Sequence, residues 1–77
     1  MEHLHFFAER AARCEGKAIA YRDAMERAAG MGDQAFAAIM RELARDAYGE
    51  ASAAYATACN SGKASLCTLL VRALAHP

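Results

Sequence analysis

The chain has 77 residues and a mass of 8.2 kDa, which leaves room for one domain, and a core this small usually supplies only about 3–5 kcal/mol. Lys and Arg number 9 and Asp and Glu also number 9, so the chain lacks the basic excess that is typical of nucleic-acid binders. Alanine accounts for 21 residues, and such small side chains favour helices that pack close together.

Composition also limits where the chain is expected to work. No apolar run approaches the ~20 residues that span a bilayer, and no basic segment with a signal core opens the sequence. The three cysteines lack CxxC spacing, which favours reduced thiols over a disulfide framework. We therefore expect one cytoplasmic helical domain over residues 1–77, of the all-α class and without a membrane segment.

The first predicted helix covers residues 2–29. Its apolar residues alternate spacings of three and four, which is the pattern of a heptad seam. The seam consists of Leu4, Phe7, Ala11, Cys14, Ala18, Tyr21, Met25 and Ala28. Gly30, Met31 and Gly32 then form a turn, and Asp33 is a natural N-cap for the next helix.

The second predicted helix covers residues 34–59 and also carries one apolar stripe. The stripe consists of Phe36, Met40, Leu43, Ala47, Ala51, Ala54 and Ala58. Because the intervening turn is short, the two helices should form an antiparallel hairpin. The core is expected to be formed by the larger seam residues, namely Leu4, Phe7, Tyr21, Met25, Phe36, Met40 and Leu43.

Charged residues predict contacts between the two helices. Glu42, Asp46 and Glu50 form a row of like charge, which is unfavourable on an isolated helix. In the antiparallel hairpin Lys17 falls opposite Asp46. Arg10 or Arg13 similarly falls opposite Glu50. We expect these ion pairs to fix the register more than they add stability, because exposed pairs contribute only about 0–1 kcal/mol.

A third, shorter helix is predicted over residues 63–75. Asn60 can take the left-handed conformation that ends the second helix, and Ser61 can cap the third. The apolar side of the third helix could fold back over Tyr48 and Tyr55. Alternatively, these two rings, seven residues apart on one face, serve as anchors for another chain.

A second row on the first helix contains only small residues at a spacing of four: Ala8, Ala12, Gly16, Ala20, Ala24 and Ala28. Such a row lets another helix approach closely, although alanine also fills exposed positions because of its high helix propensity. Gly16 favours the contact, since a glycine within a helix costs roughly 0.5–1 kcal/mol relative to Ala. The predicted partner-binding residues are Phe6, Ala12, Gly16, Ile19, Ala20, Ala24, Tyr48 and Tyr55.

Catalytic and metal chemistry find little support in the sequence. His3 and His5 are two residues apart and point to different sides of a helix, and His5 with Glu9 supplies only two ligands. No histidine is positioned to activate Cys14, which lies on the seam. We therefore expect no enzyme activity, no metal and no cofactor. A redox role for Cys59 and Cys67 stays open.

These features favour a protein that binds another protein. The expected form is a homodimeric helical bundle acting as a small regulator, inhibitor or adaptor, of the kind that bacteria and their phages encode. One alternative is an RNA-binding dimer, which would resemble Rop-like helical hairpins in architecture without sharing a motif with them. A thiol-responsive or metal-responsive sensor is the second alternative.

Overall fold

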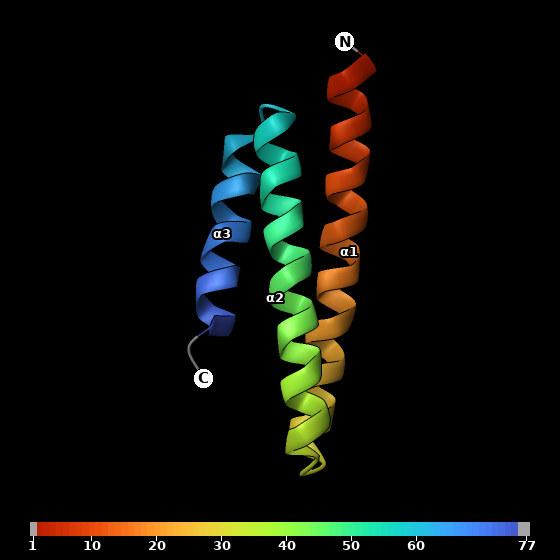
Figure 1. Cartoon of the computed structure of the whole chain (residues 1–77), viewed down its shortest axis with the longest axis vertical. Helices are drawn as coiled ribbons and strands as arrows, with labels where there is room; N and C mark the ends of the chain where they lie inside the picture. The colour runs from red at the N-terminus through yellow and green to blue at the C-terminus, as the bar shows by residue number, and fades with distance from the viewer. Residues whose placement is uncertain (1, 76–77) are drawn as a thin grey trace.

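The computed structural model describes residues 2–75, with side chains from His5 onward, as three α-helices without strands. α1 covers Glu2–Gly30, α2 covers Gln34–Thr57 and α3 covers Ser61–Ala75. Figure 1 shows α2 between the other two helices in an elongated molecule. The all-α prediction is therefore confirmed. α2 packs against both of its neighbours, whereas α1 and α3 make few direct contacts.

A Schellman motif joins α1 to α2. Gly32 has a φ of 82°, and the Asp33 amide donates to the Ala28 carbonyl at 2.9 Å. Glycine is the residue that takes this conformation at least cost. The Asp33 carboxylate then accepts a hydrogen bond from the Phe36 amide at 3.1 Å, so the N-cap predicted from the sequence is confirmed. The turn reverses the chain, and α2 runs back alongside α1 (Figure 1).

A second Schellman motif ends α2, but a cysteine occupies its left-handed position. Cys59 has a φ of 62°, its amide donates to the Ala56 carbonyl, and the Asn60 amide donates to the Tyr55 carbonyl at 2.8 Å. The prediction that Asn60 takes the left-handed conformation is therefore wrong. A Cβ atom in this region of φ is strained, so the turn stores unfavourable backbone energy at Cys59.

Asn60 caps α3 instead. Its side-chain oxygen accepts a hydrogen bond from the Lys63 amide at 3.2 Å, the geometry of an N-cap. Since the cap is Asn60 rather than the expected Ser61, α3 begins two residues earlier than predicted. α2 likewise ends at Thr57, two residues before the predicted boundary.

Replacing Cys59 with glycine should stabilise the protein. We expect the free energy of unfolding to rise by about 0.5–1 kcal/mol, because glycine removes the left-handed strain and partly offsets that gain with its own chain entropy. Urea titration of the parent and of Cys59→Gly measures the difference. Cys59→Ala is the matched control, since it removes the thiol and keeps the Cβ atom. Equal gains in both variants would show that the thiol, not the backbone, limits stability.

Small residues form most of the core. Among the described side chains the buried hydrophobic residues are nine alanines, Cys14, Cys67, Tyr48 and Tyr55, and none is Leu, Ile, Val, Met or Phe. The alanines are Ala11, Ala18, Ala28, Ala37, Ala44, Ala47, Ala51, Ala54 and Ala64. Helices with such seams can approach closely, since little side chain separates their backbones.

The core predicted from the large seam residues is therefore only partly correct. The predicted seam of α1 is buried at Ala11, Cys14, Ala18 and Ala28. Its larger members Phe7, Tyr21 and Met25 are half-buried, as is Met40 of α2, and Leu4 lies outside the described side chains.

The stripe predicted for α2 is wrong at two positions. Phe36 and Leu43 are 45% and 37% exposed, and their neighbours Ala37 and Ala44 are buried in their place. The buried face of α2 is turned toward α3, which α2 must also contact. That rotation leaves the bulky residues outside.

Candidate protein-binding surface

Large apolar side chains lie on the outside of the molecule. Those exposed by more than a third are Phe6, Ile19, Met31, Phe36, Ile39, Leu43, Leu66 and Leu69. Single exposed apolar residues are normal on soluble proteins. Here, however, eight large side chains are exposed while most buried positions hold alanine, which leaves apolar area that the described helices do not cover.

The small-residue row of α1 is largely open to solvent, as predicted for a contact surface. Ala12, Gly16 and Ala20 are exposed, and Ala24 is half-buried. A Cβ atom built on Gly16 would meet no other atom within 4 Å. Packing inside this chain therefore does not require a glycine at this position.

Tyr48 and Tyr55 do not belong to that surface, and the prediction that they contact another chain is wrong. They are 1% and 7% exposed, and α3 covers them with Ala64 and Cys67. This is the alternative in which the third helix folds back over the two rings. Leu70, Val71 and Leu74 pack around the same cluster.

The two buried tyrosines differ in how their hydroxyl groups are satisfied. Tyr55 Oη donates to Glu15 Oε1 at 2.6 Å, whereas Tyr48 Oη makes no hydrogen bond with any described residue. Glu15 Oε2 also lies 3.5 Å from Lys63 Nζ, and that amine sits over the Tyr55 ring. Glu15 belongs to α1, Tyr55 to α2 and Lys63 to α3, so this cluster links all three helices.

Hydrogen bonding and burial raise the pKa values of three groups in and around this cluster. The hydrogen bond to Glu15, followed by burial, raises the pKa of Tyr55 from 10.0 to about 12. Burial raises the pKa of Tyr48 and that of the Cys67 thiol as well. All three groups are therefore held in their neutral forms.

Stability should fall in alkaline solution because of this shift. A raised pKa in the folded state gives stability that is fully present below the unfolded value of 10.0 and is lost as the pH rises through about 12. Tyr55 alone should contribute about 3 kcal/mol of loss over that interval. Urea midpoints measured from neutral to alkaline pH test this, with Tyr55→Phe as the variant whose profile should be flatter. A parent profile identical to that of Tyr55→Phe would contradict the assignment.

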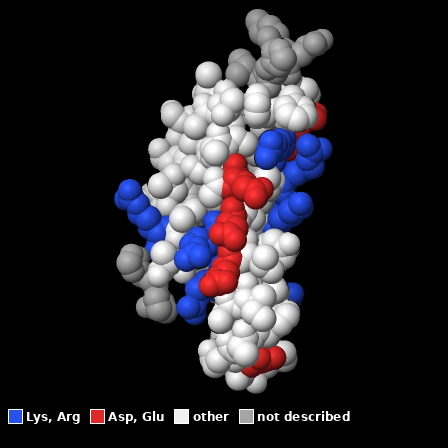
Figure 2. All heavy atoms as spheres, viewed as in Figure 1, with Lys and Arg blue, Asp and Glu red and all other residues white. Residues whose placement is uncertain are grey.

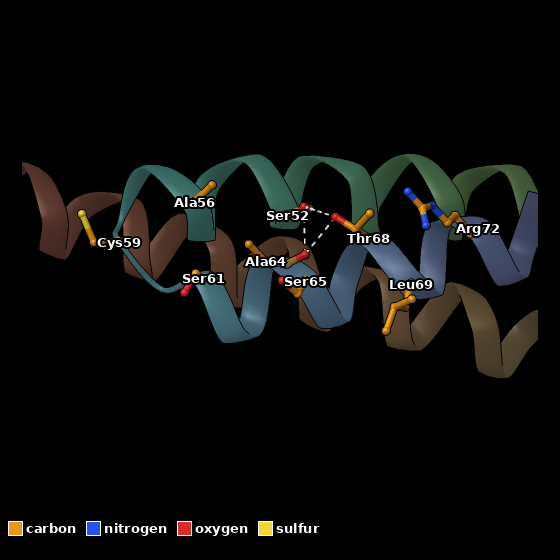
Figure 3. Close-up of a pocket in the computed structure, with 9 residues that line it drawn as sticks. All are labelled: Ser52, Ala56, Cys59, Ser61, Ala64, Ser65, Thr68, Leu69 and Arg72. Atoms are coloured by element: carbon orange, nitrogen blue, oxygen red, sulfur yellow. Dashed lines mark hydrogen bonds between the residues drawn. The ribbon is translucent and has the colours of Figure 1, made fainter.

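A shallow groove of about 600 Å³ runs between α2 and α3. Figure 3 shows hydroxyl side chains along it, with Cys59 at one end and Arg72 at the other. Ser52 Oγ lies 2.8 Å from Thr68 Oγ1 and 3.1 Å from the Ala64 carbonyl oxygen, and these contacts join α2 to α3. Thr68 Oγ1 also lies 2.9 Å from the same carbonyl oxygen, within α3. No carboxylate or imidazole lines the groove to activate a hydroxyl or the thiol.

Charge is arranged in columns on one face of α1 and α2. Figure 2 shows the acidic side chains of α2 as a column, with Lys and Arg side chains of α1 beside it. The predicted ion pairs of Lys17 with Asp46 and of Arg10 or Arg13 with Glu50 are absent within 4.0 Å among the described residues. Glu50 instead accepts from the Cys14 thiol at 3.6 Å. The two columns lie on adjacent helices, and their side chains are exposed. They stay hydrated and do not form ion pairs between α1 and α2.

Metal ligands and spanning segments are likewise absent from the described part of the chain. No group of three or more His, Cys, Asp or Glu side chains there could surround an ion. His5 contacts Glu9 across one helical turn at 2.9 Å. All three cysteines are free, and Cys59 is the exposed one. None of the described helices has the length and apolar character needed to cross a membrane.

Comparison with known proteins adds no assignment. No protein-family model, curated protein or solved structure matches the chain.

Proposed function

We propose that this protein is a small interaction module that binds a larger protein through its helical surfaces, as a regulator, inhibitor or adaptor without catalytic activity. The homodimeric bundle built on the hairpin of α1 and α2 belongs to this proposal as the form in which the module acts. The partner is a polypeptide rather than nucleic acid, because the formal charge is balanced and the acidic column lies beside the basic one.

One observation carries the proposal: among the described side chains eight large apolar residues are more than a third exposed, while nine of the thirteen buried hydrophobic residues are alanine. Leaving a Leu or Ile side chain exposed forgoes roughly 1.5–3 kcal/mol relative to full burial. A second polypeptide that covers these side chains would recover that free energy. Contact surfaces of this type are centred on a few bulky apolar anchors.

The outer surface of α1 is the place we propose for the larger partner. Ile19 is an exposed anchor on this helix, and Gly16 lies three residues before it with open space above its backbone. Ala12 continues the same surface as an exposed small residue. A helix laid over this surface could approach the α1 backbone closely, with Ile19 packed at the edge of the contact.

Steric block of this surface tests the proposal. The tagged chain is expressed in its native host, and the proteins bound to it are compared for the parent, Gly16→Leu and Ala38→Leu. Both positions are exposed within helices, and Ala38 belongs to neither contact surface. We expect Gly16→Leu to lose a specific bound protein that Ala38→Leu retains.

Circular dichroism of the two variants shows whether both stay folded. Two results would overturn the proposal. One is a bound set that is the same for both variants. The other is a parent chain that retains nothing beyond an empty-tag control.

A further inference from the structure

Two rows of exposed residues lie on neighbouring helices and form a repeating pattern. Each row alternates spacings of three and four, so it follows one side of its helix. The α2 row consists of Phe36, Ile39, Leu43, Asp46 and Glu50. The α1 row consists of Arg10, Arg13, Lys17, Ala20 and Ala24. Both rows therefore divide into an apolar half and a charged half.

The two rows share the face that α3 does not cover. Cys14, which follows Arg13, contacts Glu50 at 3.6 Å, and Arg10 lines the same hollow as Glu50. Figure 2 shows the charged halves side by side, acid on α2 and base on α1. Apart from the half-buried Ala24, every member of both rows is exposed.

The Cys14–Glu50 contact also fixes which residues lie level with each other. Because the helices run antiparallel, each step toward the end of α1 is a step toward the start of α2. Lys17 is then level with Ala47, within one residue (~1.5 Å) of Asp46. Further along, Ala20 is similarly within one residue of Leu43.

In the same register Arg13 lies within one residue of the level of Glu50, and Ala24 within one residue of that of Ile39. The four central levels therefore place charge beside opposite charge and a small residue beside a large one, whereas Arg10 beside Ala53 and Arg27 beside Phe36 lie outside this pattern.

We propose that a second copy of this chain covers this face, related to the first by a two-fold axis parallel to the helices. Such a rotation keeps the height of every residue along the helix axes and exchanges the sides on which α1 and α2 lie. It places the α2 row of each copy against the α1 row of the other. Asp46 then meets the lysine at position 17 of the other copy, and Leu43 packs over the alanine at position 20.

Two features of the face favour this arrangement over others. Ile39 and Leu43 of the α2 row fit where the opposing α1 row offers Ala24 and Ala20, which allows the close approach that helix packing requires. Opposite charges meet in the other half, where the ion pairs expected inside one chain are not formed. A two-fold axis across the helices would instead set charged residues against apolar ones. The pattern therefore selects one pairing of two identical chains.

This inference rests on the proposed function in one respect, since both require another polypeptide to cover exposed apolar residues. The two use adjoining surfaces of α1. The dimer contact takes Ala20 and Ala24 from the small-residue row together with the α2 row, and Ala12, Gly16 and Ile19 receive the larger partner. The experiments below therefore measure the mass of the chain alone, without any host protein.

Charge exchange between two chains is the most selective test. One variant carries Asp46→Lys and Glu50→Lys, and the other carries Arg13→Glu and Lys17→Glu. Each variant alone should be monomeric by light scattering, because equal charges meet at both contacts of its dimer. An equal mixture should form a heterodimer of about twice 8.2 kDa, since both of its contacts again pair acid with base. A mixture that stays monomeric while the parent is a dimer would overturn the proposed pairing.

An apolar substitution keeps the test valid if a charge variant fails to fold. Ile39→Ser removes a side chain that is 55% exposed in one chain, so the fold of that chain should be retained. Its dimer should have a dissociation constant raised roughly 100-fold, because a two-fold contact loses the residue twice. Leu69→Ser is the matched control, as Leu69 is 59% exposed on α3, away from the face. Equal dissociation constants for the two variants would place the contact elsewhere.

The parent chain distinguishes this inference from the proposed function. A chain that is monomeric at millimolar concentration would overturn the dimer, while a specific protein lost from Gly16→Leu would still support the interaction module. A dimeric parent whose set of bound host proteins is the same in Gly16→Leu would support the dimer and overturn the proposed binding of a larger partner.

Discussion

Removing the hydroxyl group of Tyr48 should raise the free energy of unfolding, whereas removing that of Tyr55 should lower it. The Tyr48 hydroxyl is buried without a hydrogen-bond partner among the described residues, so Tyr48→Phe should stabilise the protein by about 1 kcal/mol. The Tyr55 hydroxyl donates to the Glu15 carboxylate at 2.6 Å. Hydrogen bonds to charged groups contribute more, so Tyr55→Phe should cost roughly 1.5–3 kcal/mol.

The two substitutions control for each other, because both remove one oxygen from a ring that α3 covers. Urea unfolding of the parent and both variants at neutral pH measures the two differences. A Glu15→Gln variant should weaken the bond to Tyr55 and leave the effect of Tyr48→Phe unchanged. Destabilisation of similar size in both tyrosine variants would show that the Tyr48 hydroxyl has a partner in solution.

Enlarging one buried alanine should remove most of the stability of the protein. Ala51 is fully buried between the helices, so Ala51→Leu adds three carbon atoms where the backbones are already close. Overpacking of this kind typically costs 1–3 kcal/mol, and occasionally more, which approaches the roughly 3–5 kcal/mol available to a core of this size.

Ala53→Leu is the control for this substitution, as Ala53 is exposed two residues further along α2. It should change the free energy of unfolding by no more than about 0.5 kcal/mol. Thermal unfolding followed by circular dichroism compares the two variants. Equal stability of Ala51→Leu and Ala53→Leu would mean that the alanine seam has space, contrary to the close packing described above.

Local signals in the sequence were enough to predict the helices and the first turn. The alternating spacing of α1 identified its buried side, and Asp33 caps α2 as its position after the glycine turn indicated. These features depend on residues close in sequence. The second turn was predicted two residues too late at both helix boundaries, because Cys59 takes a left-handed conformation that its residue type disfavours.

The burial of α2 depended on contacts between helices and was predicted less well. Phe36 and Leu43 belong to a regular stripe, yet α2 has to face both α1 and α3, so its buried side is shared between Ala37, Ala44 and Tyr48. A periodic pattern predicts that a helix has an apolar face. It does not predict which side of the helix is buried when two other helices pack against it.

The exposure of the predicted partner-binding residues was correct for some of them and wrong for others. Phe6, Gly16 and Ile19 are exposed as expected, while Tyr48 and Tyr55 are buried because α3 covers them. The α2 row was missed, although its alternating spacing was present in the sequence. It runs from apolar residues into acidic ones, and only the geometry of the hairpin brings it beside a row of the complementary pattern.

The thermal unfolding midpoint as a function of chain concentration tests most directly whether a second copy of the chain covers the face formed by the α1 row and the α2 row. Because only folded chains associate into the dimer, the unfolding midpoint should rise with chain concentration. The rise should be smaller in Ile39→Ser than in Leu69→Ser. A midpoint that stays constant from micromolar to millimolar concentration, with a mass of 8.2 kDa throughout, would contradict the account.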